Sequence, residues 1–221
     1  MRGNPTVRLK LLGSAALLAA LYVLFCAVPR FAPSEITLEE LQASEAFREA
    51  AAKLADPSAQ LAWGEPLDYS GYLPGGDAAV CVPYACAMPR AVGTAGSSDW
   101  TFTFGVLLWD AELEQALDAS MIALEGTSLR LTPDKNTALT RLKQDPKTGS
   151  AVLLDRTEAA ACGAVAMGTK ASTLDSAVDP NETCALAMEW TVTLRPKGLL
   201  LSSGTTVSLS AQAAYQNNVK A

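Results

Sequence analysis

The chain contains no histidine, and only 18% of its 221 residues are charged. The lack of histidine excludes Ser-His-Asp and Cys-His nucleophiles, histidine metal sites and imidazole proton transfer. With 17 Lys+Arg against 23 Asp+Glu, the net charge is −6, so the basic surface that nucleic-acid binding needs is missing. No GxSxG, SxxK, P-loop or GxGxxG motif occurs. We therefore expect no catalytic residue, no cofactor, no metal ion and no nucleic-acid partner.

An apolar segment without charge or proline extends from Leu11 to Val28, and it follows three basic residues, Arg2, Arg8 and Lys10. As a helix it would be about 27 Å long, just enough to cross a hydrocarbon core of ~30 Å. All 23 acidic residues lie at or after Glu35. Because positive residues stay in the cytoplasm, the sequence predicts a single-pass inner-membrane protein with a cytoplasmic tail (1–10), a transmembrane anchor (11–28) in the lipid bilayer, and a periplasmic or extracellular C-terminal domain.

A cleaved secretory signal is the alternative interpretation of this segment. Cleavage after Ala27 would place Phe25 at position −3, and cleavage after Ala32 would place Arg30 there, whereas signal peptidases need small residues. A lipid-modified Cys26 would follow Phe25 instead of a small residue. The order of basic leader, apolar helix and β domain resembles that of type IV pilins and pseudopilins in architecture alone, because Leu18 stands where their motif has glutamate.

Residues 34–56 have the pattern of one amphipathic helix next to the membrane. Thr37 and Glu40 form a capping box at its start, and the Asp56-Pro57 pair ends it. One apolar stripe recurs at helical spacing and consists of Leu38, Leu41, Phe47, Ala51 and Leu54. This stripe either packs on its own domain or forms a partner-binding surface, and its residues are the partner-binding candidates.

Residues 58–221 are predicted to form one extracytoplasmic domain, so the fold class is α+β: a transmembrane helix, a juxtamembrane helix and a mainly antiparallel β domain. Period-two alternation predicts strands at 100–109, at 184–195 and at 204–215. Residues 78–88 read as a β segment with a turn at Pro83-Tyr84. Leu113, Leu117, Met121 and Leu124 are spaced as one helical face, with Asp110 as N-cap and Gly126 as the stop, which predicts a helix over 110–126.

Four of the five cysteines follow the apolar segment, and in an exported domain an even number favours two disulfides. Pairing by proximity joins Cys81 to Cys86 and Cys162 to Cys184, while the crossed pairings stay open. The spacing of Cys81 and Cys86 fits neither a CxxC redox motif nor a usual zinc knuckle.

Three further sequence patterns give only weak indications of a binding or catalytic site. Oxygen donors gather at Asp175, Asp179, Asn181 and Glu182, but without the glycine of a calcium loop. Ser97, Ser98 and Asp99 stand in a glycine-bearing segment that reads as a turn rather than a nucleophile loop. The aromatic segment from Trp63 to Tyr72, with Asp68, Asp77 or Asp99 as polar groups, would be the pocket wall of a ligand-binding or hydrolytic domain.

These patterns together predict a non-catalytic assembly or interaction subunit of a bacterial cell-envelope complex of the secretion, conjugation or pilus type. Its partners would be other membrane or envelope proteins, because antiparallel strand edges accept partner strands. The alternative is a periplasmic or secreted ligand-binding or hydrolytic domain that works without histidine.

Overall fold

The computed structural model describes residues 31–55, 59–70, 78–91, 97–141, 151–152, 158–159, 161–175, 182–197 and 204–216. Its elements in chain order are β1 (Ala32–Pro33), α2 (Leu38–Ala43), α3 (Glu45–Leu54), β2 (Gln60–Trp63), β3 (Leu67–Asp68), β4 (Ala79–Ala91), β5 (Ser97–Asp110), β6 (Gln115–Leu117), η2 (Ala119–Met121), β7 (Ile122–Pro133), β8 (Thr137–Arg141), β9 (Ala151–Val152), β10 (Glu158–Ala159), η3 (Ala161–Gly163), β11 (Val165–Asp175), β12 (Thr183–Pro196) and β13 (Thr205–Gln216).

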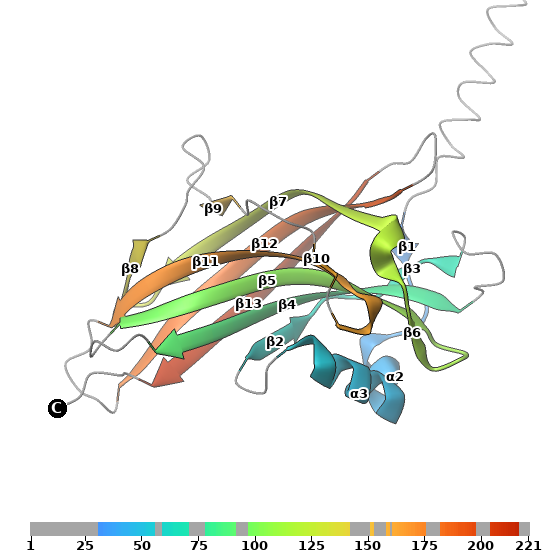
Figure 1. The fold of residues 1–221 in the computed structure, drawn as a ribbon, viewed down its shortest axis with the longest axis horizontal. Coiled ribbons are helices and arrows are strands. Elements are labelled where there is room, and N and C mark those ends of the chain that lie inside the picture. Colours follow the sequence, from blue (N-terminus) through green and yellow to red (C-terminus); the bar gives the residue numbers. More distant parts are fainter. Residues whose placement is uncertain are drawn as a thin grey trace, which may run out of the picture.

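The strands form two antiparallel sheets. Sheet A has the order β1-β3-β4-β5-β11-β10, with β2 also paired to β4, β6 to β5 and β8 to β11. Sheet B has the order β13-β12-β7-β9. Figure 1 shows the long strands of both sheets running across the molecule, with α2 and α3 on one side next to β2 and β6. The described chain is therefore mostly antiparallel β structure with two short α-helices.

The main core lies between the two sheets. The alternation of β5 directs Trp100, Phe102 and Phe104 to this core, and β12 contributes every second residue from Cys184 to Leu194. The rings of Phe104 and Trp190 lie 5.8 Å apart across it. The prediction of strands in these segments is confirmed: β12 alternates between buried and more exposed side chains, whereas β5 alternates up to Phe104 and is buried on both faces from Gly105 to Asp110.

A second core lies on the opposite face of sheet A, beneath the helices. It joins Phe47 and Leu41 of the helices to the apolar side chains of β4 and β5. Phe47 is fully buried and meets the edge of Trp109 with ring centroids 5.2 Å apart. Gly105 lies directly opposite Tyr84, whose ring occupies the space that a Cβ at position 105 would need. The molecule thus has three layers, namely helices, sheet A and sheet B.

The predicted helix over 34–56 is two helices. The capping box is confirmed: Glu40 N–H donates to Thr37 Oγ1, and Thr37 N–H donates to Glu40 Oε2. The chain breaks at Ser44, which has an extended conformation (φ −69°, ψ 132°) and caps the second helix by accepting from the Phe47 N–H at 3.3 Å. Serine competes for backbone hydrogen bonds, which explains why the helix restarts at this residue.

The predicted helix over 110–126 is wrong. Asp110 does accept from the N–H groups of Glu112 and Leu113, as an N-cap would. Glu114, however, has a left-handed backbone (φ 48°), so the chain turns back and pairs as β6 with the end of β5. Leu113, assigned to an apolar helix face, is 64% exposed. The helical spacing of the leucines is coincidental, because the turn at Glu114 reverses the chain.

The predicted turn at Pro83-Tyr84 is also wrong, because β4 continues through both residues. The Pro83 carbonyl accepts from Gly64 N–H at 2.8 Å, just past the end of β2. In a strand, the N–H and C=O groups of one residue point to the same side. The position of the N–H that Pro83 lacks therefore faces the gap between β2 and β3, and no hydrogen bond between β4 and β5 is lost.

The two predicted disulfides are absent, because none of the four cysteines in the described part is joined to another by a disulfide. Cys81 and Cys86 belong to one strand, where five residues span about 17 Å, whereas a disulfide needs Cα atoms less than ~7 Å apart. Cys184 lies in the core between the sheets, while Cys162 packs against the helix-side core. The Cys184 thiol donates to the Asn136 carbonyl at 3.3 Å.

The prediction of a single-pass membrane protein is corrected as well. Across the described ranges, no helix has the length and apolarity needed to cross a bilayer. The two α-helices have 6 and 10 residues, far short of the ~20 that a span requires. Residues 1–10 and 11–28, on which the tail and the anchor were predicted, lie outside the described residues. The fold class is therefore restated as mainly antiparallel β, without a predicted anchor or disulfides.

Candidate functional site

The free edge of sheet B is the first candidate site. β13 is the terminal strand of this sheet, and its twelve residues TTVSLSAQAAYQ include no charge and no proline. Its register with β12 runs without a bulge from Thr205 to Gln216. Edge strands of monomeric proteins are commonly protected by charges, prolines or bulges. β13 has none of these three.

The hydrogen bonds of Ala214 reveal which backbone groups of β13 point outward. Ala214 N–H donates to Gln60 Oε1 at 3.1 Å, and Gln60 Nε2 donates to the Ala214 carbonyl at 2.6 Å. Gln60 lies on β2 of the other sheet, so both backbone groups of Ala214 point away from β12. Alternate residues share this direction in an antiparallel strand. The same outward direction therefore applies to Thr206, Ser208, Ser210 and Gln212.

These four residues form the open edge, a name we keep for Thr206, Ser208, Ser210 and Gln212. Their side chains are exposed, and in the described structure their outward N–H and C=O groups have no hydrogen-bond partner. The inward side chains of β13, such as Leu209 and Ala213, are buried in the main core. The core thus holds the strand in place while one row of its backbone groups points away from β12 and is unpaired in the described structure.

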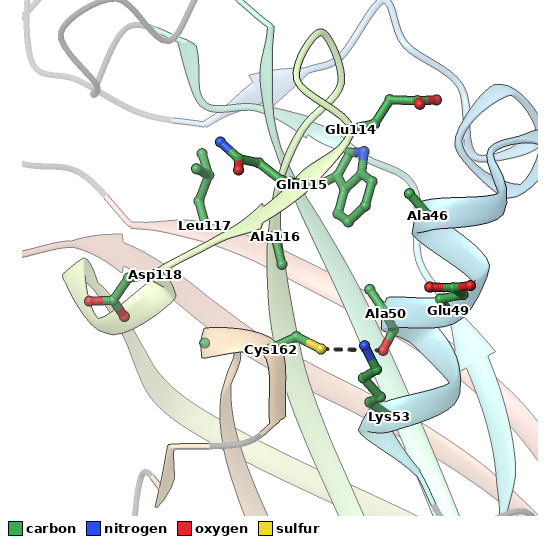
Figure 2. Close-up of a pocket in the computed structure, with 12 residues that line it drawn as sticks. Ala46, Glu49, Ala50, Lys53, Glu114, Gln115, Ala116, Leu117, Asp118 and Cys162 are labelled. Carbon is green, nitrogen blue, oxygen red and sulfur yellow. Dashed lines mark hydrogen bonds between the residues drawn. The ribbon is translucent and has the colours of Figure 1, made fainter.

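The second candidate site lies between α3 and the β6 to η3 region. Figure 2 shows Ala46, Glu49, Ala50 and Lys53 of α3 on one side and the residues of β6 on the other, with Cys162 between them. The cavity has a volume of about 330 Å³. A neighbouring cavity of about 320 Å³ lies beside α2 and is lined by Glu35, Ile36, Glu40, Leu41, Ser44, Trp109, Ala111 and Glu114.

Trp109 and Glu114 line both cavities. Trp109 is only 2% exposed, and its indole N–H has no hydrogen-bond acceptor in the described structure. The indole N–H of Trp100, by contrast, donates to Thr173 Oγ1 at 2.9 Å. Trp190 Nε1 also has no partner, but it is sealed in the core, whereas Trp109 Nε1 is not among the solvent-inaccessible atoms.

The backbone around the first cavity is unusual. In the described chain, Glu114 and Cys162 are the non-glycine residues with positive φ, at 48° and 56°. Both line this cavity, and Gly163 (φ 70°) lies next to Cys162. The Cys162 thiol points toward α3 and lies 3.7 Å from the Ala50 carbonyl oxygen (Figure 2). Left-handed residues of this kind require support from their surroundings, here the contact between η3 and α3.

The predicted apolar stripe packs mainly within the domain. Leu41 and Phe47 are buried in the helix-side core, and Leu38 and Leu54 are partly buried against it. Ala51 is half-buried. No observation tests whether a partner binds these residues, so that assignment stays a prediction, with Leu41 and Phe47 offering little accessible surface.

The weaker chemical patterns do not converge on one place. Ser98 and Asp99 lie within β5, where Ser98 is buried and Asp99 accepts from the Ser172 hydroxyl at 2.6 Å. Asp68 instead accepts from the backbone and hydroxyl of Ser70. Positions 72, 77, 179 and 181 lie outside the described residues. Among the residues that are described, no group of three acids or cysteines is arranged to hold a metal ion.

Sequence reasoning missed Gln60 and Glu114. The alternation of 204–215 did predict the strand, and its lack of charge was visible, but its terminal place in the sheet depends on pairing between distant segments. The chain matches no known protein-family model, and neither a curated protein nor a solved structure is significantly similar to it. The function must therefore be argued from the site itself.

Proposed function

We propose that this protein is a non-catalytic interaction module that binds a partner protein by accepting a partner β-strand at the open edge. The observation that carries the proposal is the uncharged, proline-free and bulge-free edge of β13. β-Strand addition uses main-chain hydrogen bonds for affinity and alternate side chains for specificity. The open edge offers both features, because its outward backbone groups are unpaired and its side chains are exposed.

The hydrogen-bond count gives the scale of the interaction. Each residue of the open edge presents one N–H and one C=O, and each bond that a partner strand makes contributes a net ~0.5–1.5 kcal/mol. Ala214 is already satisfied by Gln60, so the incoming strand would end before this position. The contact between Gln60 and Ala214 therefore limits how far along β13 a partner strand can pair.

The absence of histidine from the sequence favours binding over catalysis, because the commonest general acid and base is missing. The described carboxylates at Asp68 and Asp99 are already occupied by neighbouring serines. An interaction role needs none of these groups to be reactive.

Site-specific photo-crosslinking tests the proposal. A photo-reactive residue at Ser210 should capture a partner in the native host, whereas the same residue at Arg130 should not. Arg130 is exposed on the same face of sheet B but two strands away, about 10 Å from the edge.

A second substitution in the same experiment identifies the contact. Ser208→Pro removes an outward N–H and should abolish the Ser210 crosslink, while Ser208→Ala keeps the N–H and should retain it. Equal capture at Ser210 and Arg130, or a crosslink that survives Ser208→Pro, would overturn the proposal.

A further inference from the structure

The structure also points to a small-ligand site, independent of the strand edge. We infer that the two cavities lined by Trp109 form a binding site for a small organic cation that carries a hydrogen-bond acceptor oxygen. Both cavities share Trp109 and Glu114, so one ligand at these two residues would extend into either space. Their volumes, about 330 and 320 Å³, lie at the lower end of ordinary ligand pockets.

The acceptor requirement comes from the indole of Trp109. Its Nε1 is not among the solvent-inaccessible atoms, so water can accept from it, and a ligand that displaces this water must supply an acceptor to avoid leaving the donor unpaired. Trp109 is more than nine-tenths buried, and its ring lines both cavities. Within the described structure, its Nε1–H group has no hydrogen-bond acceptor. A ligand carbonyl or hydroxyl oxygen would supply the missing acceptor.

The positive charge follows from the side chains around the cavities. The acids that line them outnumber the single base, Lys53, and they are Glu35, Glu40, Glu49, Glu114 and Asp118. Two of these carboxylates already accept other hydrogen bonds, Glu40 from Thr37 and Asp118 from Ser120. Glu114 has no such partner in the described chain, and it belongs to both cavities.

Glu114 is also fixed in position by its backbone. Its φ of 48° ends the turn after β5, where Asp110 accepts from the N–H groups of Glu112 and Leu113. The backbone of Glu114 is therefore held by a short, hydrogen-bonded turn, and its exposed side chain lines the same two cavities as Trp109. This arrangement suits a ligand that bonds to Trp109 through an oxygen and to Glu114 through a cationic group.

Two isosteric probes test the assignment on the intact protein. N-acetyl-argininamide carries a guanidinium and amide oxygens, whereas N-acetyl-citrullinamide has nearly the same shape and the same amide oxygens, with a neutral urea group in place of the guanidinium. The readout is the ¹H–¹⁵N signal of the Trp109 indole, assigned by its loss in Trp109→Phe. We expect the arginine probe to shift this signal saturably, and the citrulline probe to bind about fivefold more weakly, as for loss of a partly exposed ion pair.

Matched variants locate the charge. Glu114→Gln should weaken binding of the arginine probe by about fivefold, whereas Glu39→Gln, an equal charge change on α2 outside both cavities, should alter it by less than about twofold. The inference is overturned if the Trp109 signal shows no saturable shift, if both probes bind equally, or if Glu39→Gln and Glu114→Gln have equal effects. The comparison of probes needs no variant, so a folding defect in Glu114→Gln would leave the test intact.

Discussion

The side-chain amide of Gln60 binds the backbone of Ala214 as a neighbouring strand would. It donates to the carbonyl at 2.6 Å and accepts the N–H at 3.1 Å, so both groups of one edge residue are satisfied by a residue of the other sheet. This pair closes one end of β13 and leaves the open edge beside it. It also demonstrates that the outward groups of this strand have the geometry to make hydrogen bonds.

Replacing Gln60 with glutamate should destabilise the fold. The carboxylate cannot donate, so its oxygen would face the Ala214 carbonyl, and we expect the free energy of unfolding to fall by about 1–2 kcal/mol in urea titrations. Gln212→Glu makes the same chemical change at an exposed position of β13 and should shift stability by less than ~0.5 kcal/mol. Equal effects of the two substitutions would contradict the role given to Gln60.

Two threonines provide the same substitution with opposite expected results. Thr173 Oγ1 accepts from Trp100 Nε1 in the core, so Thr173→Val leaves that N–H without this acceptor and should cost about 1–3 kcal/mol. Thr137 Oγ1 is buried without a partner, so Thr137→Val should be neutral or stabilising. Chemical unfolding of both variants decides the point, and a larger loss at Thr137 would refute the assigned contacts.

The capping box predicts a pH dependence. Hydrogen bonds from Thr37 lower the pKa of Glu40 below its ordinary value of 4.5. A depressed folded-state pKa means that the stabilisation is present above pH 4.5 and is lost as the pH falls through the lower folded value. Glu40→Gln should therefore lower the thermal midpoint at about pH 6 and make little difference at about pH 3. Glu39→Gln is the control, and a loss independent of pH would argue against the mechanism.

The cysteines should react in a defined order. Burial raises the pKa of the Cys81 thiol, and Cys184 is fully buried, so neither should be alkylated in the native protein at mildly alkaline pH. Cys162 is half-buried and should react first. In denaturant without reductant, mass spectrometry should find Cys81, Cys86, Cys162 and Cys184 all labelled. Labelling that appears only after reduction would restore the disulfide prediction.

The sequence patterns correctly predicted those elements that depend on interactions between residues close together in the sequence. The alternation of Trp100, Phe102 and Phe104 specified a strand, and Thr37 with Glu40 specified a helix start, because those interactions involve neighbours in sequence. The helix predicted after Asp110 was wrong for a different reason. Its leucine spacing fitted a helix, but the left-handed Glu114 and the pairing with β5 overrode it.

The candidate sites depend on contacts that no local pattern encodes. Gln60 and Ala214 lie 154 residues apart in sequence, and Trp109 packs against Phe47 of a helix more than sixty positions earlier in the chain. The cysteine count suggested disulfides because it assumed an exported domain and ignored that Cys81 and Cys86 share one strand. Strand order decides both sites, and strand order is a non-local property.

Residue-level amide hydrogen exchange on β13, without and with the crosslinked partner, tests the central claim most directly. In the free protein the N–H groups of Ser208, Ser210 and Gln212 should exchange rapidly, while those of Leu209 and Ala211, which point toward β12, should be protected. With the partner bound, the first group should become protected too. Protection of Ser208 and Ser210 in the free protein, or no gain of protection in the complex, would contradict strand addition at this edge.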